Sequence, residues 1–361
     1  MVQFQKNITK RKGGRFMGRF TIGNNENGKS VYQYVYGKTY EEAEKKLMIG
    51  LEIESQYLAG NSISVREVYA EWLNATAHRV KVSTLSNYRM KVEKHILPML
   101  GDKPCSMLTA VIINDFISKK LAEGLSASYV RDIVVVLKTM LHYAQEEYHF
   151  ILPLGNVAMP KCEKKQTEKL SESEKNALVS YLRQNMDLTA FGILISLYMG
   201  LRIGELCGLQ WGDVAFERHV LHIRRTVQRI SAPEGKRKTQ VIVSSPKSQT
   251  SRRSIPIPDC LMAYFRQFRA DDACWLLSGT DKLIEPRTMQ YRYKKILAKA
   301  GASGHTYHQL RHTFATNCVE SGFDVKTLSI LLGHSSASLT LNRYVHPDFA
   351  HEQRLMNSLR M

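Results

Sequence analysis

The sequence predicts a multidomain, mainly α-helical protein: a small N-terminal β-sheet plus helix, an α-helical domain, and a mixed α+β domain. Three observations predict this order. Strand-like residues flank an Asn/Gly-rich turn within residues 16–36, apolar residues repeat at helical spacing within 113–144, and Val- and Ile-rich strands return within 220–258. The 361 residues are enough for more than one hydrophobic core. We expect domains at residues 1–60, 61–160 and 168–361.

The first predicted domain is strongly basic. Residues 1–38 contain eight Lys and Arg against a single acid, Glu26. The pattern predicts a three-stranded sheet backed by one helix, which begins at a capping box formed by Thr39 and Glu42. Such a sheet can lie in the major groove of DNA, whereas the alternative is a charged, solvated face on an accessory domain.

The second predicted domain is a compact group of four or five helices. Apolar side chains recur at helical spacing in residues 113–121 and 130–144, and Ser83 and Ser126 are expected N-caps. Isolated lysines here can touch phosphates, or they can simply solvate the surface. The candidate DNA contacts of the first two domains are Arg15, Arg19, Lys29, Lys81 and Lys91.

The charge of the chain favours a polyanionic partner. There are 51 Lys and Arg against 33 Asp and Glu, which gives a net charge of +18 and a pI near 9.6. No apolar run is long enough to span a bilayer and no secretory leader is present, so we expect a cytoplasmic, nucleoid-associated protein without a membrane partner. The six cysteines follow no zinc-ligand spacing, and we expect no metal and no cofactor.

Six polar residues in the second half suggest phosphoryl transfer without a metal. Two arginines, a lysine and two histidines can surround one phosphate, and a nearby tyrosine can attack it. The six are Arg202, Lys247, His308, Arg311, His334 and Tyr344. Arg202 follows an apolar helix, while His308 and Arg311 are three residues apart and so share a helix face.

The motifs around these residues resemble those of the tyrosine recombinase family of the phage-integrase type. The resemblance covers residues 170–346 and rests on Arg-x-x-Glu-Leu at 202–206, His-x-x-Arg at 308–311, Leu-Gly-His at 332–334, and Tyr-Val-His at 344–346. It implies that the third domain is catalytic. The second domain is similar to the family's helical, SAM-like core-binding domain, and the first resembles the arm-binding domain of integrases from phages and conjugative transposons.

The resemblance also implies a role for each residue. Tyr344 would be the nucleophile, and Arg202 and Arg311 would clamp the non-bridging phosphate oxygens. His308 would accept or orient the tyrosine proton, and His334 would hydrogen-bond the phosphate. Glu205 matches the family's acidic position and would hold an active-site group; its alternative is a surface acid. Tyr307 is the next candidate nucleophile.

Lys247 would protonate the leaving 5′ oxygen. It lies in residues 245–251, which we expect to form the tip of a β-hairpin, a place from which a lysine can enter the minor groove. The match to the family's hairpin lysine rests on the neighbouring Pro246 and on the Ser-Arg-Arg-Ser-Ile-Pro segment at 251–256. Lys236 and Lys238 are rival candidates.

The implied function is site-specific recombination: an integrase and excision enzyme of a mobile element that forms a 3′-phosphotyrosine link. The implied partners are double-stranded DNA at core and arm sites, three further copies in a homotetramer, and accessory excision or DNA-bending proteins. A catalytically idle DNA-binding protein and a type IB topoisomerase-like enzyme are the alternatives. Metal binding by His305, His308 and His312 is a further alternative, disfavoured because Gln309 replaces the glutamate of a metalloprotease helix.

Overall fold

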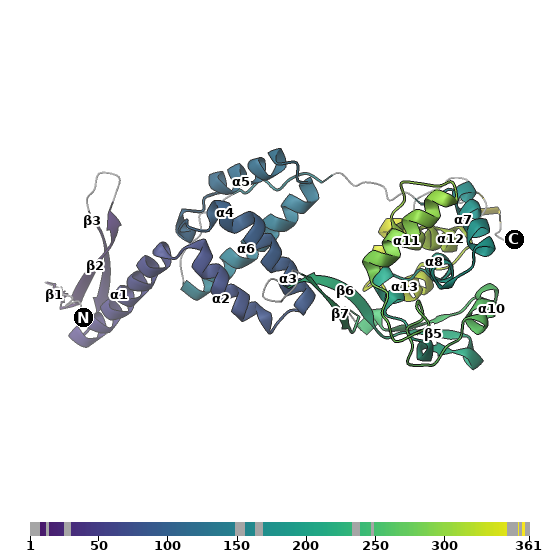
Figure 1. Cartoon of the computed structure of the whole chain (residues 1–361). Helices are drawn as coiled ribbons and strands as arrows, with labels where there is room; N and C mark the ends of the chain where they lie inside the picture. Colours follow the sequence, from purple (N-terminus) through teal and green to yellow (C-terminus); the bar gives the residue numbers. More distant parts are fainter. Residues whose placement is uncertain are drawn as a thin grey trace. The chain divides into compact units, whose positions relative to one another are not determined.

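The computed structural model describes residues 8–11, 14–24, 30–148, 156–162, 169–232, 239–246, 249–344, 353 and 356–357. The chain divides into two compact units, Met1–Glu163 and Lys164–Met361 (Figure 1). Helices dominate both units, and each unit contains strands, so the predicted mainly α-helical multidomain fold is confirmed. Among the described helices, none combines the length and the apolar character needed to cross a bilayer.

The first unit begins with an antiparallel sheet in the order β1-β2-β3, covered on one face by a helix (Figure 1). The elements are β1 (Ile8–Lys10), β2 (Phe16–Asn24), β3 (Ser30–Gly37) and α1 (Tyr40–Ser62). The Thr39 hydroxyl accepts the Glu42 N–H at 3.2 Å, so Thr39 caps α1 as predicted. The Glu42 carboxylate accepts the N–H of Lys38 at 2.8 Å and not that of Thr39, so the reciprocal bond of the predicted capping box is not formed. Phe20 and Leu47 are buried between sheet and helix.

The remaining helices of the first unit enclose their own core. They are α2 (Val65–Ala77), α3 (Val82–Lys91), α4 (Leu97–Leu100), α5 (Ala110–Ala122) and α6 (Ala127–Tyr148), with a π-helical turn at residues 92–96. The Ser126 hydroxyl accepts the Tyr129 N–H at 3.3 Å and caps α6 as predicted. The predicted cap at Ser83 is wrong. Lys81 has an extended backbone and is the N-cap residue, so helix α3 begins at Val82 and Ser83 already lies in its first turn.

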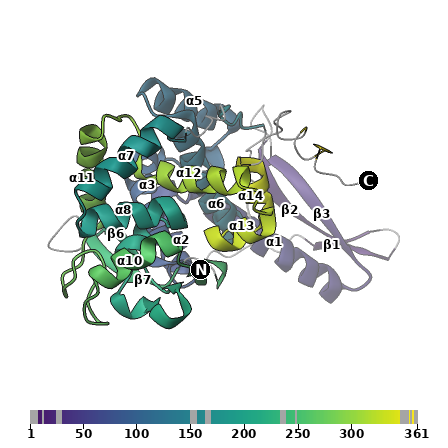
Figure 2. The same ribbon diagram turned by 90° about the vertical axis from the view of Figure 1, so that its right-hand side faces the viewer.

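The second unit is built around α8, a helix that is apolar on all sides and therefore buried. Helix α12 lies beside it (Figure 2). Ser171 and Glu174 form a capping box at the start of α7. The helices of this unit are α7 (Glu172–Gln184), α8 (Leu188–Met199), α9 (Ile203–Cys207), α10 (Asp259–Gln267), α11 (Pro286–Lys299), α12 (Tyr307–Glu320), α13 (Val325–Leu332) and α14 (Ala337–Tyr344).

The strands of the second unit pair differently from the prediction. They are β4 (Val214–Ala215), β5 (Val220–Ile223), β6 (Thr226–Ser231), β7 (Thr239–Ser244) and β8 (Arg253–Pro256), in sheets of order β4-β5-β8 and β6-β7. The hairpin is therefore β6–β7, and residues 245–252 connect two different sheets, so the predicted hairpin tip at 245–251 is wrong. Arg224 and Arg225 separate β5 from β6, and the Arg225 side chain turns inward, with Nη2 2.5 Å from Asp213 Oδ2 and Nε 3.2 Å from the Gly208 carbonyl.

Candidate active site

Glu205 is the centre of a buried charge cluster. It lies on α9, one turn after Arg202, and its side chain is 3% exposed. Arg202 Nη1 donates to Oε1 at 2.6 Å, and Arg253 donates to both carboxylate oxygens, from Nη1 at 3.1 Å and from Nη2 at 2.9 Å. Burial alone would raise the pKa of this carboxyl, but the guanidinium groups of Arg253 and Arg202 outweigh it and lower the pKa to about 2. Glu205 is therefore ionised and orients two arginines.

The C-terminal end of α13 binds three arginines through consecutive backbone carbonyls. Arg253 Nε donates to Leu331 O at 2.6 Å, Arg311 Nη2 to Leu332 O at 2.7 Å, and Arg202 Nη2 to Gly333 O at 3.2 Å. The last carbonyls of a helix lack partners within the helix and lie at the negative end of its dipole, so cations are favoured there. The arginines thereby fix the segment that leads into His334.

Arg311 is buried and ties two helix ends together. Its side chain is among the largest that are fully enclosed, and Arg311 is 2% exposed. Besides Leu332, its Nη1 donates to the carbonyl of Gly200, which ends α8, at 2.8 Å. A planar guanidinium with several fixed donors can bridge two carbonyls in this way, whereas a lysine ammonium cannot present the same fork. Arg202 and Arg311, predicted to act together, lie on either side of the same two helix ends.

Glycine is required where these helices end. Gly333 has φ +62°, and a Cβ there would lie 2.9 Å from Arg253 Nη1 and 3.1 Å from the Thr250 carbonyl. Gly200 has φ +66°, and a Cβ there would clash with the Phe314 ring. Both positions adopt the left-handed conformation that closes a helix. The glycines allow the arginines and α12 to approach the helix ends closely.

The two histidines lie in different environments. His334 follows Gly333, and its Nδ1 is 2.8 Å from the hydroxyl of the fully buried Thr340 on α14, a hydrogen bond that sets the orientation of the ring. His308 is exposed in the first turn of α12, with its ring 4.7 Å from that of the buried His312 in an edge-on arrangement. The exposed imidazole of His308 suits proton transfer to or from a bound substrate, and the oriented ring of His334 suits a hydrogen bond to it.

Part of the predicted set cannot be placed. Tyr344 is the last residue of α14, ten residues after His334, but its side chain lies outside the described part of the molecule. Lys247 and its rivals Lys236 and Lys238 also lie outside the described residues. The residues that the structure does bring together are Arg202, Glu205, Arg311 and the Gly333–His334 segment.

The rival tyrosine has a structural role. Tyr307 is 5% exposed, and its hydroxyl lies 2.9 Å from the Ser196 hydroxyl inside the core. Burial raises the pKa of Tyr307 well above its usual range, because a phenolate cannot be solvated there. Its hydroxyl is therefore not accessible to a phosphate in this structure.

The three neighbouring histidines on and before α12 do not converge. His305 Nε2 lies 2.9 Å from Glu174 Oε1, and so joins the capping box of α7. His312 is buried at 3% while His308 is exposed. Within the described ranges, no group of three or more His, Cys, Asp or Glu side chains is arranged to hold a metal ion. The arrangement gives the metal-binding alternative no support.

The candidate DNA contacts of the first unit differ in accessibility. Arg15, Arg19 and Lys81 are exposed, and the guanidinium of Arg19 lies 4.9 Å from the centre of the Tyr32 ring. Lys91 is 6% exposed, with its Nζ 3.3 Å from Asp132 Oδ2. It is therefore engaged within its own domain rather than presented to a ligand. Lys29 lies outside the described residues.

Arg253 is a site residue that the sequence motifs did not reveal. A signal for it exists: in strand β8, Arg253 precedes the buried Ile255 by two residues, and Ile257 continues the same alternation. Side chains two residues apart in a strand share a face, so Arg253 has to point into the domain. An arginine on a core-facing position needs a buried anion, and Glu205 supplies it.

Comparisons with known proteins agree with this arrangement. A model of the phage integrase family matches residues 163–351, and a model of the phage integrase N-terminal SAM-like domain matches residues 64–121. A tyrosine recombinase XerC-like protein of Caldanaerobacter subterraneus subsp. tengcongensis is 29% identical, in an alignment that covers 90% of each chain.

Two solved structures share the fold at lower identity. The Tn1549 transposon integrase, in complex with a circular intermediate DNA, superimposes with a TM-score of 0.69 at 22% identity over 83% of this chain and 100% of that one. A lambda integrase dimer bound to a core site gives 0.60 at 18% identity over 96% of each chain. With a family model matched over more than half of its length, this protein belongs to the phage integrase family and is a tyrosine recombinase.

Proposed function

We propose that this tyrosine recombinase is the integrase and excision enzyme of a mobile genetic element, cleaving and rejoining DNA through a 3′-phosphotyrosine link. The observation that carries the proposal is the arginine cluster around Glu205 at the end of α13. Positive charge is fixed there before any substrate arrives, and preorganised charge is an effective way to stabilise a phosphoryl-transfer transition state. Helix α14, which ends at Tyr344, follows directly in the chain.

In the proposed mechanism the Tyr344 oxygen attacks the scissile phosphorus. A tyrosine hydroxyl has an ordinary pKa near 10, so it must lose its proton as it attacks, and His308 takes that proton. Arg202 and Arg311 bind the non-bridging oxygens, Arg311 once bound DNA has made its enclosed guanidinium accessible, and His334 donates a further hydrogen bond to them. Glu205 orients Arg202 by accepting a hydrogen bond from its Nη1.

Lys247 gives a proton to the 5′ oxygen as the P–O bond breaks. The product is a 3′-phosphotyrosine and a free 5′ hydroxyl, so the energy of the phosphodiester is kept in the new link. A 5′ hydroxyl of another strand then attacks the same phosphorus and releases Tyr344, which requires neither ATP nor a metal in this scheme. Strand exchange follows when the attacking hydroxyl belongs to a second duplex.

We assign the three predicted domains, residues 1–60, 61–160 and 168–361, to arm-site binding, core-site binding and catalysis. The open face of the N-terminal sheet supports the first assignment, because Arg19 lies there with three exposed tyrosines of β3, Tyr32, Tyr34 and Tyr36. Arginine and tyrosine side chains donate hydrogen bonds to the phosphate and sugar groups of DNA, so this exposed face suits a DNA surface. Arg15 and Lys81 are exposed as well, and we assign them to contacts with DNA phosphates.

The proposed assembly is a homotetramer on two DNA duplexes in the cytoplasm, with excision or DNA-bending proteins as accessory partners. A lambda integrase tetramer has been solved on a Holliday junction, which supports this stoichiometry for a protein of the same fold. The Tn1549 integrase complex with circular intermediate DNA supports the mobile-element role. A net charge of +18 suits the large DNA surface of such an assembly.

Nicked suicide duplexes test the proposal. They should cover the ends of the element that carries the gene, be incubated with protein in EDTA, and be resolved on a denaturing gel. We expect a covalent protein–DNA band with the wild type and none with Tyr344→Phe, while both proteins bind the uncleaved duplex. Binding without an adduct by both proteins would favour the idle DNA-binding alternative. Relaxation of supercoiled plasmid without exchange between two duplexes would favour the topoisomerase-like one.

A further inference from the structure

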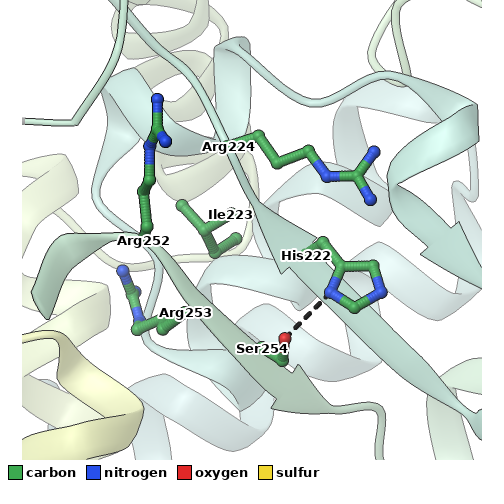
Figure 3. Close-up of a pocket in the computed structure, with 6 residues that line it drawn as sticks. All are labelled: His222, Ile223, Arg224, Arg252, Arg253 and Ser254. Atoms are coloured by element: carbon green, nitrogen blue, oxygen red, sulfur yellow. Dashed lines mark hydrogen bonds between the residues drawn. The ribbon is translucent and has the colours of Figure 1, made fainter. Parts of the chain in front are cut away.

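A basic hollow lies on the sheet formed by β5 and β8, and Arg253 of the arginine cluster is one of its lining residues (Figure 3). It has a volume of about 450 Å³. Its lining residues are His222, Ile223, Arg224, Arg252, Arg253 and Ser254. They come from the ends of β5 and β8 and from the residues that immediately follow or precede these strands.

The strand register decides which side chains face the hollow. His222 is paired with Ser254 across β5 and β8, and His222 Nδ1 lies 2.8 Å from the Ser254 hydroxyl (Figure 3). Ser254 is exposed on the outer face together with His222, while Arg253, the first residue of β8, directs its guanidinium to Glu205 and lines the hollow only at its edge. Arg252 precedes β8 and is exposed.

The charges around the hollow are unbalanced. None of its described lining residues carries a carboxylate. Arg253 is neutralised by Glu205, and Arg224 Nη1 lies 3.5 Å from Asp213 Oδ1, an acid already paired with Arg225 at 2.5 Å. Arg252 is exposed, and its guanidinium forms no ion pair or hydrogen bond with another residue of the described ranges. The excess charge of Arg224 and Arg252 calls for an external anion.

We propose that this hollow binds a DNA backbone phosphate that neighbours the scissile phosphate, with Arg252 and Arg224 as its ligands. The inference rests on the proposed function, because the anion next to a phosphate-cleaving site is the next phosphate of the same DNA. Position supports it: β8 carries Arg253 into the active site, and residues 245–252, which include Lys247, lead directly into Arg253. A phosphate bound by Arg252 would hold the DNA in the position at which Arg202 and Arg311 reach the scissile phosphate.

A scan of single neutralised phosphates tests the proposal. Each linkage around the cleavage position is replaced in turn by an uncharged methylphosphonate, and the Kd of each duplex is measured for wild type, Arg252→Gln and the control Arg266→Gln. Arg266 is an exposed arginine on α10, away from the hollow. At one linkage near the cleavage position, the methylphosphonate should weaken binding by the wild type and by the control about tenfold relative to the unmodified duplex. Arg252→Gln should bind the modified and the unmodified duplex equally well, because it has already lost this contact.

The slope of log Kd against log salt gives a second readout. For Arg252→Gln it should be smaller than for the wild type by about one, the change expected for one lost phosphate contact. If the variant and the wild type lose affinity equally at every linkage, the proposed phosphate site is wrong. The covalent adduct keeps the two proposals apart, because the wild type and the control Arg266→Gln, which both keep the proposed phosphate site, should both form it. Absence of the adduct in the wild type would instead contradict the proposed function.

Discussion

Arg253 and Glu205 form a two-point ion pair, with Nη1 3.1 Å from Oε1 and Nη2 2.9 Å from Oε2, and their side chains are only 4% and 3% exposed. Neither residue is a proposed ligand of the scissile phosphate. Their pairing instead fixes the carboxylate that orients Arg202, and Arg253 also holds the end of α13 through Leu331. Arg253 is therefore a positioning residue.

Arg253→Gln should destabilise the protein and slow cleavage. Removal of one member of a buried ion pair leaves the other charge unpaired, which costs about 3–5 kcal/mol. Urea unfolding measures this cost. The exposed neighbour Arg252 provides the control, because Arg252→Gln should change the free energy of unfolding by less than about 0.5 kcal/mol. Equal effects of the two substitutions would contradict the structural role of Arg253.

Acid should remove the contribution of Glu205 to stability. Its pKa is lowered to about 2 in the folded protein from an ordinary 4.5, so the ionised form stabilises the fold at any pH above about 4.5. The contribution falls as the pH drops from 4.5 toward 2, because the unfolded chain then takes up the proton first. In urea unfolding at several pH values, the stability advantage of wild type over Glu205→Gln should shrink across this window. An advantage that is constant with pH would argue against an ionised Glu205.

Gly333→Ala should lower the stability of the protein by more than the backbone strain of a left-handed conformation alone would. Gly304 has φ +82°, and a Cβ at this position would meet no heavy atom within 4 Å, so Gly304→Ala should cost only the backbone strain of about 1–2 kcal/mol. At Gly333 the new methyl group would also meet Arg253 Nη1 at 2.9 Å. Thermal unfolding of both variants separates the two costs, because Gly304→Ala introduces only backbone strain whereas Gly333→Ala also displaces Arg253. A smaller loss at Gly333 than at Gly304 would contradict the close packing.

Arg202→Lys should lower the rate of adduct formation by about 10²–10³-fold, the usual effect of losing one preorganised donor to a developing oxyanion. The guanidinium donates simultaneously to Glu205 and to the Gly333 carbonyl, and a lysine cannot keep both bonds while it binds a phosphate. Single-turnover cleavage of the suicide duplex measures the rate, and binding of the uncleaved duplex should change little. An unchanged cleavage rate would remove Arg202 from the proposed phosphate clamp.

The helices were predictable from the sequence because their signals are local. The cap at Thr39, the capping box at Ser171 and the apolar repeats in 113–144 depend only on residues a few positions apart. Strand pairing is not local. The Val- and Ile-rich residues 220–227 give one signal, yet Arg225 turns inward to Asp213, and the two halves join different sheets. For this reason the sequence predicts a hairpin tip at 245–251, where the chain in fact passes from one sheet to the other.

The site shows the same division. The motif residues Arg202 and Arg311 were predicted to act together, and the structure places both at the end of α13. The partner of Glu205 could not be identified from spacing alone, since Arg252 and Arg253 are adjacent and only one of them faces the core. The inward-facing member follows from the buried Ile255, once strand β8 is known.

The central claim is that Tyr344 carries the DNA, and peptide mapping of the covalent adduct tests it most directly. After nuclease and trypsin digestion, cleavage following Arg343 yields a peptide of residues 344–354 that contains no other tyrosine. We predict that this peptide, measured by mass spectrometry, carries a nucleotide on Tyr344 through a 3′-phosphate. A nucleotide found on any other tyrosine, or an adduct that persists in Tyr344→Phe, would contradict it.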